Sequence, residues 1–251
     1  MAGDDRSAAN TRPNVHILRR DLAAAFRAAV RFGMHEGVCN HFSLAVDADR
    51  AFLLNPHGVH FSRLRASNLL LVDAEGRSVE GSEKRHTAFF IHARIHLANP
   101  RARCVLHAHP RNATALTMLR GGRLLPCHQN ALRFHGRVAY YDEYDGLILD
   151  EAEGDRIADA LAGSTVLFMK HHGVIVTGPT VADALDDLYY LERAAEAQIT
   201  AMSTGAELAL VPEEIAAATA KQFERLNPVN AAMHFDELKR ILDHEEPDYA
   251  N

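Results

Sequence analysis

Apolar side chains recur along most of the chain with either the period of a helix or the alternation of a strand. From Ile17 to about His35 they return every three to four residues, which predicts a helix with one buried face. The same period predicts helices over 87–97, 112–119 and 150–161, a long helix capped by Thr180, and a helical stretch after Val211 with a joint at Asn227-Pro228. Short apolar or alternating runs predict strands over 42–46, 51–54, 69–72, 104–109, 138–141, 166–169 and 174–176.

The order of these elements indicates an α/β fold. A strand-rich stretch from Phe42 to Val79 precedes the alternation of helices and strands, which favours a mainly antiparallel sheet layered with helices over a doubly wound parallel sheet. The polar segment 1–16 is expected to be a disordered lead. Residues 17–251 are expected to form one domain with a helical C-terminal tail, since 251 residues suffice for one large domain.

Composition excludes several partners. A formal net charge of −6 gives no broad basic field for a phosphate backbone, so we expect no nucleic-acid binding. No apolar run approaches the roughly 20 residues of a membrane-spanning helix, and the polar start lacks the apolar core of a signal peptide. Three widely spaced cysteines predict reduced thiols in a cytoplasmic protein.

Two histidine pairs follow apolar runs and are candidates for metal binding. His107 and His109 follow the run that begins at Cys104, and alternation in a strand would place both side chains on one face. His171 and His172 end the run from Val166. Three neutral imidazoles with an open fourth position would make a catalytic divalent-metal centre. With 16 His in the chain, however, an isolated pair can also be incidental.

Several motifs, taken together, resemble the class II aldolase/adducin family. They are Asn40-His41-Phe42-Ser43, Asn55-Pro56-His57-Gly58, Asn99-Pro100, the His-Ala-His-Pro segment from His107, and His172-Gly173 before an apolar strand. They occur in the family's order and spacing between about Ile17 and Met202. The resemblance implies a three-layer α/β/α fold with a central, mainly antiparallel sheet. It also implies a divalent metal and a homotetramer whose sites lie between subunits.

The family's metal-binding histidines match His107, His109 and His172. The resemblance implies zinc as the first expectation for the metal, with manganese or iron as alternatives. His171 takes the place beside the third ligand, where we expect it to support the site without binding the metal.

Other family positions suggest residues for substrate. Asn40, His41 and Gly58 match loop groups that face a substrate phosphate in the aldolases. His128 lies as far beyond the histidine pair as the aldolases' catalytic tyrosine, so it is a candidate acid from a neighbouring subunit. Tyr140 belongs to an aromatic cluster in the same stretch. The rings of this cluster would suit a planar or apolar acid; the alternative is that they simply pack in the core or an interface.

One family motif is missing. The sugar-phosphate aldolases open the helix before the histidine strand with Ser-Ser-Glu, and the position of that glutamate is Ala88 here, after His86-Thr87. Glu83 could replace it only with a five-residue shift. His92, one turn before His96 on the same helix, could supply replacement chemistry. The loss argues against aldol cleavage of a phosphorylated sugar.

These residues predict a divalent-metal-dependent carbon–carbon lyase. The expected reaction is decarboxylation, or aldol cleavage, of a non-phosphorylated hydroxy-aromatic or keto acid through a metal-stabilised enolate. His41, His57 or His128 would protonate the resulting carbanion. Two alternatives stay open: an Fe(II) oxygenase-type enzyme with the same three histidines, and a non-catalytic interaction module like the adducins.

Overall fold

The computed structural model of the protein describes residues 14–47, 51–79, 89–144, 146–147 and 151–251. Within these ranges seven strands form one sheet in the order β3-β2-β1-β4-β7-β6-β5. The strands are β1 His41–Asp47, β2 Ala51–Leu54, β3 Leu70–Asp73, β4 Cys104–Ala108, β5 Val138–Tyr141, β6 Val166–Met169 and β7 Gly173–Gly178. Each lies on a run that the sequence pattern predicts.

The sheet is mainly antiparallel, as predicted. Every neighbouring pair is antiparallel except β5 and β6, which run parallel. The central strand β4 lies between β1 and β7, and both neighbours contribute to the candidate site. In the β1–β4 register, His41 is opposite His107 and Ser43 is opposite Val105. Opposed residues share a face, so the two histidines point to the same side of the sheet.

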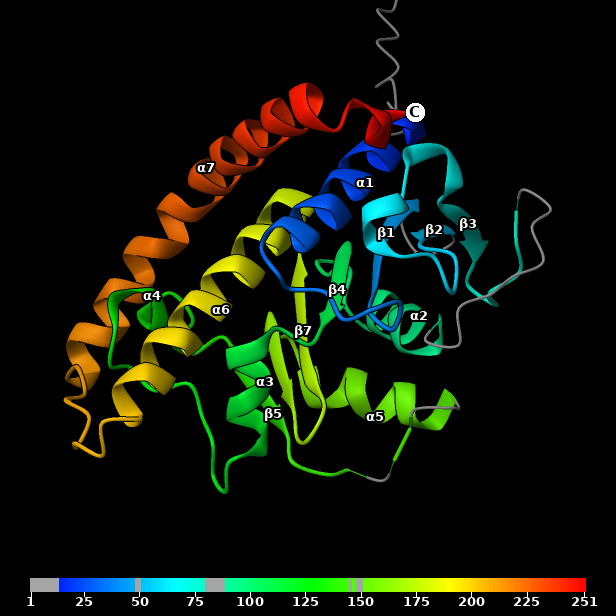
Figure 1. Ribbon diagram of the computed structural model, residues 1–251. Helices are drawn as coiled ribbons and strands as arrows, with labels where there is room; N and C mark the ends of the chain where they lie inside the picture. The colour runs from blue at the N-terminus through cyan, green and yellow to red at the C-terminus, as the bar shows by residue number, and fades with distance from the viewer. Residues whose placement is uncertain (1–13, 48–50, 80–88, 145, 148–150) are drawn as a thin grey trace, which may run out of the picture.

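Helices cover both faces and make the three layers α/β/α. They are α1 Val15–Arg31, α2 Phe89–Ala98, α3 Arg111–Met118, α4 Gln129–Leu132, α5 Glu151–Leu161, α6 Val181–Met202 and α7 Glu213–Glu245. Helices α2 and α5 bury Ile91 and Ile157 against Val105 on one face. Helices α1 and α6 bury Phe26 and Leu188 on the other. Figure 1 shows α7 running along the outside of α6, which it contacts.

Two helices differ from the sequence expectations: α1 begins earlier, and α7 is not interrupted. Asn14 caps α1 through its side-chain oxygen, so the helix begins at Val15 and includes two residues that were assigned to the lead. Residues 1–13 lie outside the described ranges. The predicted joint at Asn227-Pro228 is wrong, because α7 continues through Pro228. Proline removes one helical hydrogen bond, and Pro228 lies on the exposed side, where water can satisfy the carbonyl left over.

The acidic C-terminal segment packs onto α1. The guanidinium of Arg27, which is 5% exposed, donates to the Leu64 carbonyl at 3.0 Å. It also pairs with Glu246 at 3.0 Å and with Asp248 at 3.1 Å. The Asn251 carbonyl accepts from the backbone N–H of Ser67 at 2.8 Å. These bonds make the last residues part of the fold rather than a solvated tail.

A buried ion cluster joins α6 to the chain after α4. Arg133 donates from Nη2 to Asp186 and from Nε to Asp187 Oδ1, the latter at 3.0 Å. Arg137 donates to the other Asp187 oxygen at 2.6 Å, and His234 of α7 lies 2.7 Å from Asp186. The two carboxylates are 2% and 4% exposed. The cluster therefore neutralises charge inside the protein where α4, α6 and α7 meet.

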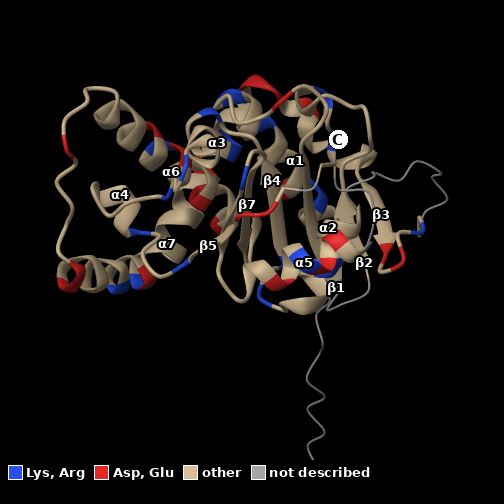
Figure 2. Ribbon diagram, turned by 90° about the horizontal axis from the view of Figure 1, so that it is seen from below, with Lys and Arg blue, Asp and Glu red and all other residues tan. Residues whose placement is uncertain are grey.

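The described surface carries both signs of charge. Figure 2 shows acidic and basic positions alternating along α7 and around the loops. In the part of the chain that the structure describes, no helix has both the length and the apolar character needed to cross a membrane.

Candidate metal centre

The sheet brings His107, His109 and His172 together. His107 lies in β4 and His109 just beyond its end, on the same face, while His172 ends the turn between β6 and β7. One ring nitrogen from each lies within 4.8 Å of the others. The ring centroid of His172 is 4.7 Å from that of His107 and 4.8 Å from that of His109. Strand alternation and the antiparallel β4–β7 pairing produce this cluster.

Hydrogen bonds to the far nitrogens orient two of these rings. His107 donates from Nδ1 to the Val174 carbonyl at 3.1 Å, and His109 donates from Nδ1 to the Glu36 carboxylate at 2.5 Å. A neutral imidazole has one N–H, so both Nε2 atoms carry lone pairs. These Nε2 atoms face each other at 3.0 Å. Two lone pairs at that separation repel, and a shared divalent cation would turn the repulsion into coordination. The donor set thus suits a metal.

The surroundings favour the neutral form of two of the imidazoles, those of His107 and His172. Burial, reinforced by the neighbouring histidines, lowers the pKa of His107 well below its ordinary value. Burial also lowers the pKa of His172 to about 4, with His109 adding to the effect. Because a metal binds only the unprotonated nitrogen, these shifts leave the ligand atoms available at neutral pH.

Close approach of the two chain segments depends on Gly173. A Cβ at this position would lie 2.5 Å from His109 Cδ2 and 2.7 Å from the Ala108 carbonyl. Glycine therefore lets the start of β7 pass beside the end of β4. The preceding residue, His171, has a left-handed φ of 58°, and its ring packs edge-on against Tyr144. His171 does not join the cluster of three.

Asn40 offers a buried donor near this end of the sheet. Its side-chain oxygen accepts from the Glu36 N–H at 2.6 Å, while its Nδ2 has no partner among the described residues. Asn40 is 1% exposed. The side chain of Asn55 holds the neighbouring backbone in place. Its Nδ2 donates to the Asn40 backbone carbonyl at 3.4 Å, and its Oδ1 accepts from the Phe42 N–H at 3.2 Å. An unsatisfied buried amide is costly, so Nδ2 is suited to bind an oxygen of a ligand.

His41 and His92 lie behind the three histidines. The His41 ring stacks on His107 with centroids 4.6 Å apart, and its Nδ1 lies 2.5 Å from Nε2 of His92. Both are buried, at 5% and 1% exposure. Helix α2 presents His92 to the face of β1 that carries His41. The structure thus places these two predicted residues against the candidate metal ligands.

Three other predicted site residues that the structure describes lie on loops. His57 and Gly58 form an exposed turn after β2, where Gly58 has a φ of 78°. His128 is exposed before α4, and no described contact joins it to the three histidines. Ala88, Glu83 and His86-Thr87 fall outside the described residues, so the expectation about a missing carboxylate stays a prediction.

Tyr140 faces a different cavity. A hollow of about 530 Å³ is lined by Tyr140, Phe168, Arg123, Lys170 and His171, among others, and not by the three histidines. The Tyr140 oxygen accepts from the Leu124 N–H at 3.0 Å. Arg123 lies over its ring at 4.2 Å from the centroid. This geometry therefore does not support a role for Tyr140 in binding substrate at its own subunit's three histidines.

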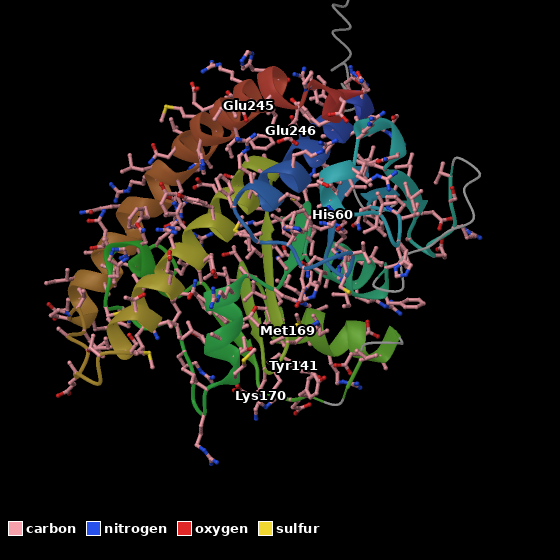
Figure 3. The ribbon with its side chains drawn as sticks, in the orientation of Figure 1. His60, Tyr141, Met169, Lys170, Glu245 and Glu246 are labelled. Atoms are coloured by element: carbon pink, nitrogen blue, oxygen red, sulfur yellow. The ribbon has the colours of Figure 1, made fainter. Side chains whose placement is uncertain are left out.

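Two tyrosines that follow Tyr140 in the chain, Tyr141 and Tyr144, line a hollow beside His172. His172 lines a small hollow with Tyr141, Tyr144 and Met169, where Lys170 also contributes. Figure 3 shows Tyr141, Met169 and Lys170 gathered at this end of β5 and β6. Side chains of successive strand residues point to opposite faces, so Tyr141 and Met169 share the face opposite Tyr140 and Phe168.

Glu36 is the residue near the site that the sequence pattern did not indicate. We expect Glu36→Ala to lower metal affinity roughly 10- to 100-fold, because the carboxylate orients His109 and makes its Nε2 more basic. Glu36→Gln keeps an acceptor oxygen and should lose less. Competition with a chelator of known affinity measures both. Unchanged affinity in Glu36→Ala would show that the carboxylate has no such role.

Comparison with known proteins gives the family. Residues 20–199 match the family described as Class II Aldolase and Adducin N-terminal domain. An aldolase class 2-type protein of Pseudomonas aeruginosa is 32% identical over 237 residues, which cover 92% of this chain and 91% of that protein. Rat alpha-adducin is 34% identical over 194 residues, covering 75% of this chain but 26% of the adducin.

Solved structures agree with this assignment. An aldolase II superfamily protein from Pseudomonas syringae superposes with a TM-score of 0.88 at 34% identity, covering 96% of this chain and 98% of that one. L-fuculose 1-phosphate aldolase from Glaciozyma antarctica gives a TM-score of 0.80 at 25% identity, covering 98% and 96%. The chain belongs to the class II aldolase and adducin family.

Proposed function

We propose that this protein is a divalent-metal-dependent carbon–carbon lyase that decarboxylates a non-phosphorylated hydroxy-aromatic or keto acid. The observation that carries the proposal is the set of three imidazoles with converging nitrogens. His107, His109 and His172 would hold the metal, with zinc as the first expectation. A divalent cation held there would supply Lewis-acid stabilisation of negative charge on the substrate.

The chain's own groups have distinct tasks in this proposal. Nδ2 of Asn40, a buried donor without a described partner, would bind a substrate oxygen. His41, packed against His107, would return a proton to the carbon that CO₂ leaves. His57 and His128 are both exposed, and in this proposal they would act in a site shared with a second subunit.

The lining beside His172 supports a planar acid. Tyr141 and Tyr144 provide aromatic faces, and Lys170 provides a positive charge that would attract a carboxylate. A polyhydroxylated sugar phosphate would need more hydrogen-bonding groups than these two rings offer. The solved L-fuculose 1-phosphate aldolase is similar in fold, and its substrate is the relevant comparison for the test.

A CO₂-release screen tests the proposal. Protein reconstituted with zinc, manganese or, under anaerobic conditions, Fe(II) is incubated with hydroxylated aromatic acids and with keto acids. We expect metal-dependent CO₂ release for at least one acid. Aldehyde formation without CO₂ would favour aldol cleavage, and oxygen consumption with Fe(II) would favour an oxygenase. Turnover of fuculose phosphate above roughly 1 s⁻¹ would contradict the substrate class.

Adducin relatives give the second candidate function, a non-catalytic interaction module. The observation against it is the convergence of three histidine nitrogens, with His107 and His109 oriented through their Nδ1 atoms. A protein that binds metal but turns over none of the acids, sugars or oxygen would favour this alternative.

We further propose a homotetramer with sites shared between subunits. His128 is exposed and has no described contact with the three histidines, which is consistent with a residue used by a neighbour. Light scattering should give about four times the monomer mass. His128→Ala protein should lose activity without losing metal. A monomer with full metal-dependent activity would exclude a shared site.

A further inference from the structure

A continuous line of buried hydrogen bonds runs from the loop after α2 to His41. It begins at the Ala102 carbonyl, which lies 2.7 Å from Nδ1 of His96. It continues from His96 Nε2 to the Ser43 hydroxyl at 2.7 Å, and from that hydroxyl to His92 Nδ1 at 2.6 Å. The last step joins His92 Nε2 to His41 Nδ1 at 2.5 Å. None of the four side chains is more than 5% exposed.

The carbonyl at one end fixes the direction of every proton in the neutral line. A carbonyl oxygen only accepts, so Nδ1 of His96 carries the N–H and Nε2 carries the lone pair. The Ser43 hydroxyl must therefore donate to His96, and its oxygen accepts from Nδ1–H of His92. Nε2 of His92 is then an acceptor, and His41 donates to it from Nδ1. The lone pair of His41 remains on Nε2.

The far end of the line resists a positive charge. His96 is 3% exposed, and burial lowers its pKa to about 4. A proton that moved along the whole line from His41 would leave a cation in the core on His96. The line is therefore suited to holding His41 in one tautomer, and it is poorly suited to carrying protons away from the site.

We infer that Ser43, His92 and His96 are positioning residues that hold His41 as the Nδ1–H tautomer, with Nε2 as the proton acceptor at the metal centre. The β1–β4 register places His41 directly opposite His107, and their rings stack. The tautomer is a property of the chain alone. Only its use in a reaction rests on the proposed function.

In that reaction the tautomer determines what His41 can do. With a hydroxy-aromatic acid, Nε2 would take the proton of the substrate hydroxyl, so an O–H bond breaks, an N–H bond forms and His41 becomes an imidazolium. The bond to the carboxylate then breaks, CO₂ leaves, and the electron pair stays on carbon. The Nε2 proton passes to that carbon, and His41 returns to its neutral state. The oxyanion that remains would take a proton from water after the product leaves. One group thus serves first as base and then as acid.

Nitrogen-15 NMR of histidine-labelled protein tests the inference without substrate or metal. Solid-state spectra separate N–H nitrogens from lone-pair nitrogens, and the His41 signals are identified by their absence in His41→Gln protein. In the unmodified protein we expect His41 to show N–H at Nδ1 and a lone pair at Nε2. Ser43→Ala removes the hydroxyl that accepts from Nδ1–H of His92, so we expect His92 to shift its proton to Nε2 and donate to His41.

That shift should raise the share of the Nε2–H form of His41 roughly tenfold or more. Ser43→Thr keeps a hydroxyl and should retain the original tautomer. Ser62→Ala is the matched control, because it removes a hydroxyl bound to His60 at 2.7 Å, outside the line. It should leave His41 unchanged.

Two results would overturn the inference: N–H at Nε2 of His41 in the unmodified protein, or an unaltered tautomer ratio in folded Ser43→Ala protein. The first measurement needs no variant of the line, so it decides the matter even if Ser43→Ala fails to fold. A negative CO₂-release screen, by contrast, would count against the proposed lyase and not against the tautomer.

Discussion

Protein carrying His107→Ala or His172→Ala is expected to lose its stoichiometric divalent metal. Each change removes one of three converging nitrogens, so the fall in affinity should exceed the roughly 10- to 100-fold typical of changes to the groups that orient a ligand. Elemental analysis after dialysis against a metal-buffered solution gives the metal content. Circular dichroism shows whether each variant is folded.

The two variants complement each other. His107 is buried in β4 and also holds the Val174 carbonyl, so its loss could weaken the sheet, whereas His172 lies at a turn. The control is His244→Ala, a histidine in the last turn of α7. It should keep its metal. Folded His172→Ala protein with one tightly bound metal per chain would exclude the three-histidine centre.

Arg133→Ala is expected to lower the free energy of unfolding by about 3–5 kcal/mol. The change leaves Asp186 and Asp187 as buried carboxylates whose main partner is gone, and it also removes the guanidinium that lies 4.5 Å from the Tyr190 ring centroid. After the change, Arg137 still donates to Asp187 and His234 still contacts Asp186, so each carboxylate keeps one of these partners. Urea unfolding followed by circular dichroism measures the loss.

An exposed ion pair provides the comparison. Arg240, whose side chain is 71% exposed, pairs with Glu237 one turn away on α7. Pairs of this kind contribute about 0–1 kcal/mol, so Arg240→Ala should leave the urea midpoint almost unchanged. If Arg133→Ala and Arg240→Ala lower the free energy of unfolding equally, burial of the cluster does not determine its contribution to stability.

The fold was predictable from sequence because its strands and helices have clear periods. Alternation and short apolar runs located every strand, and the strand-rich start indicated an antiparallel sheet. The break expected at Asn227-Pro228 failed for a physical reason. Proline removes one hydrogen bond, but the packing of α7 on α6 through residues such as Ala231 and Phe235 outweighs that loss.

The candidate site was predictable only where its residues are local in sequence. Spacing alone places His107 and His109 on one face, and the family resemblance added His172. Glu36 gave no signal, since it lies 73 residues from His109 in a loop. Tyr141, not Tyr140, lines the hollow beside His172, and a short run of four strand residues does not reveal which face does so. The role of Tyr140 stays a prediction.

The site depends on the register of β1 against β4 as much as on its side chains, so the number of residues before β1 matters. His41 and Ser43 reach α2 because they sit two residues apart on one face, opposite His107 and Val105. Deleting a single residue before His41 would turn this pair toward α1 and move Phe42 from the α1 face to the face covered by α2. Substitutions in β1 change single side chains and keep this register, whereas an insertion or deletion keeps it only in the loops on either side.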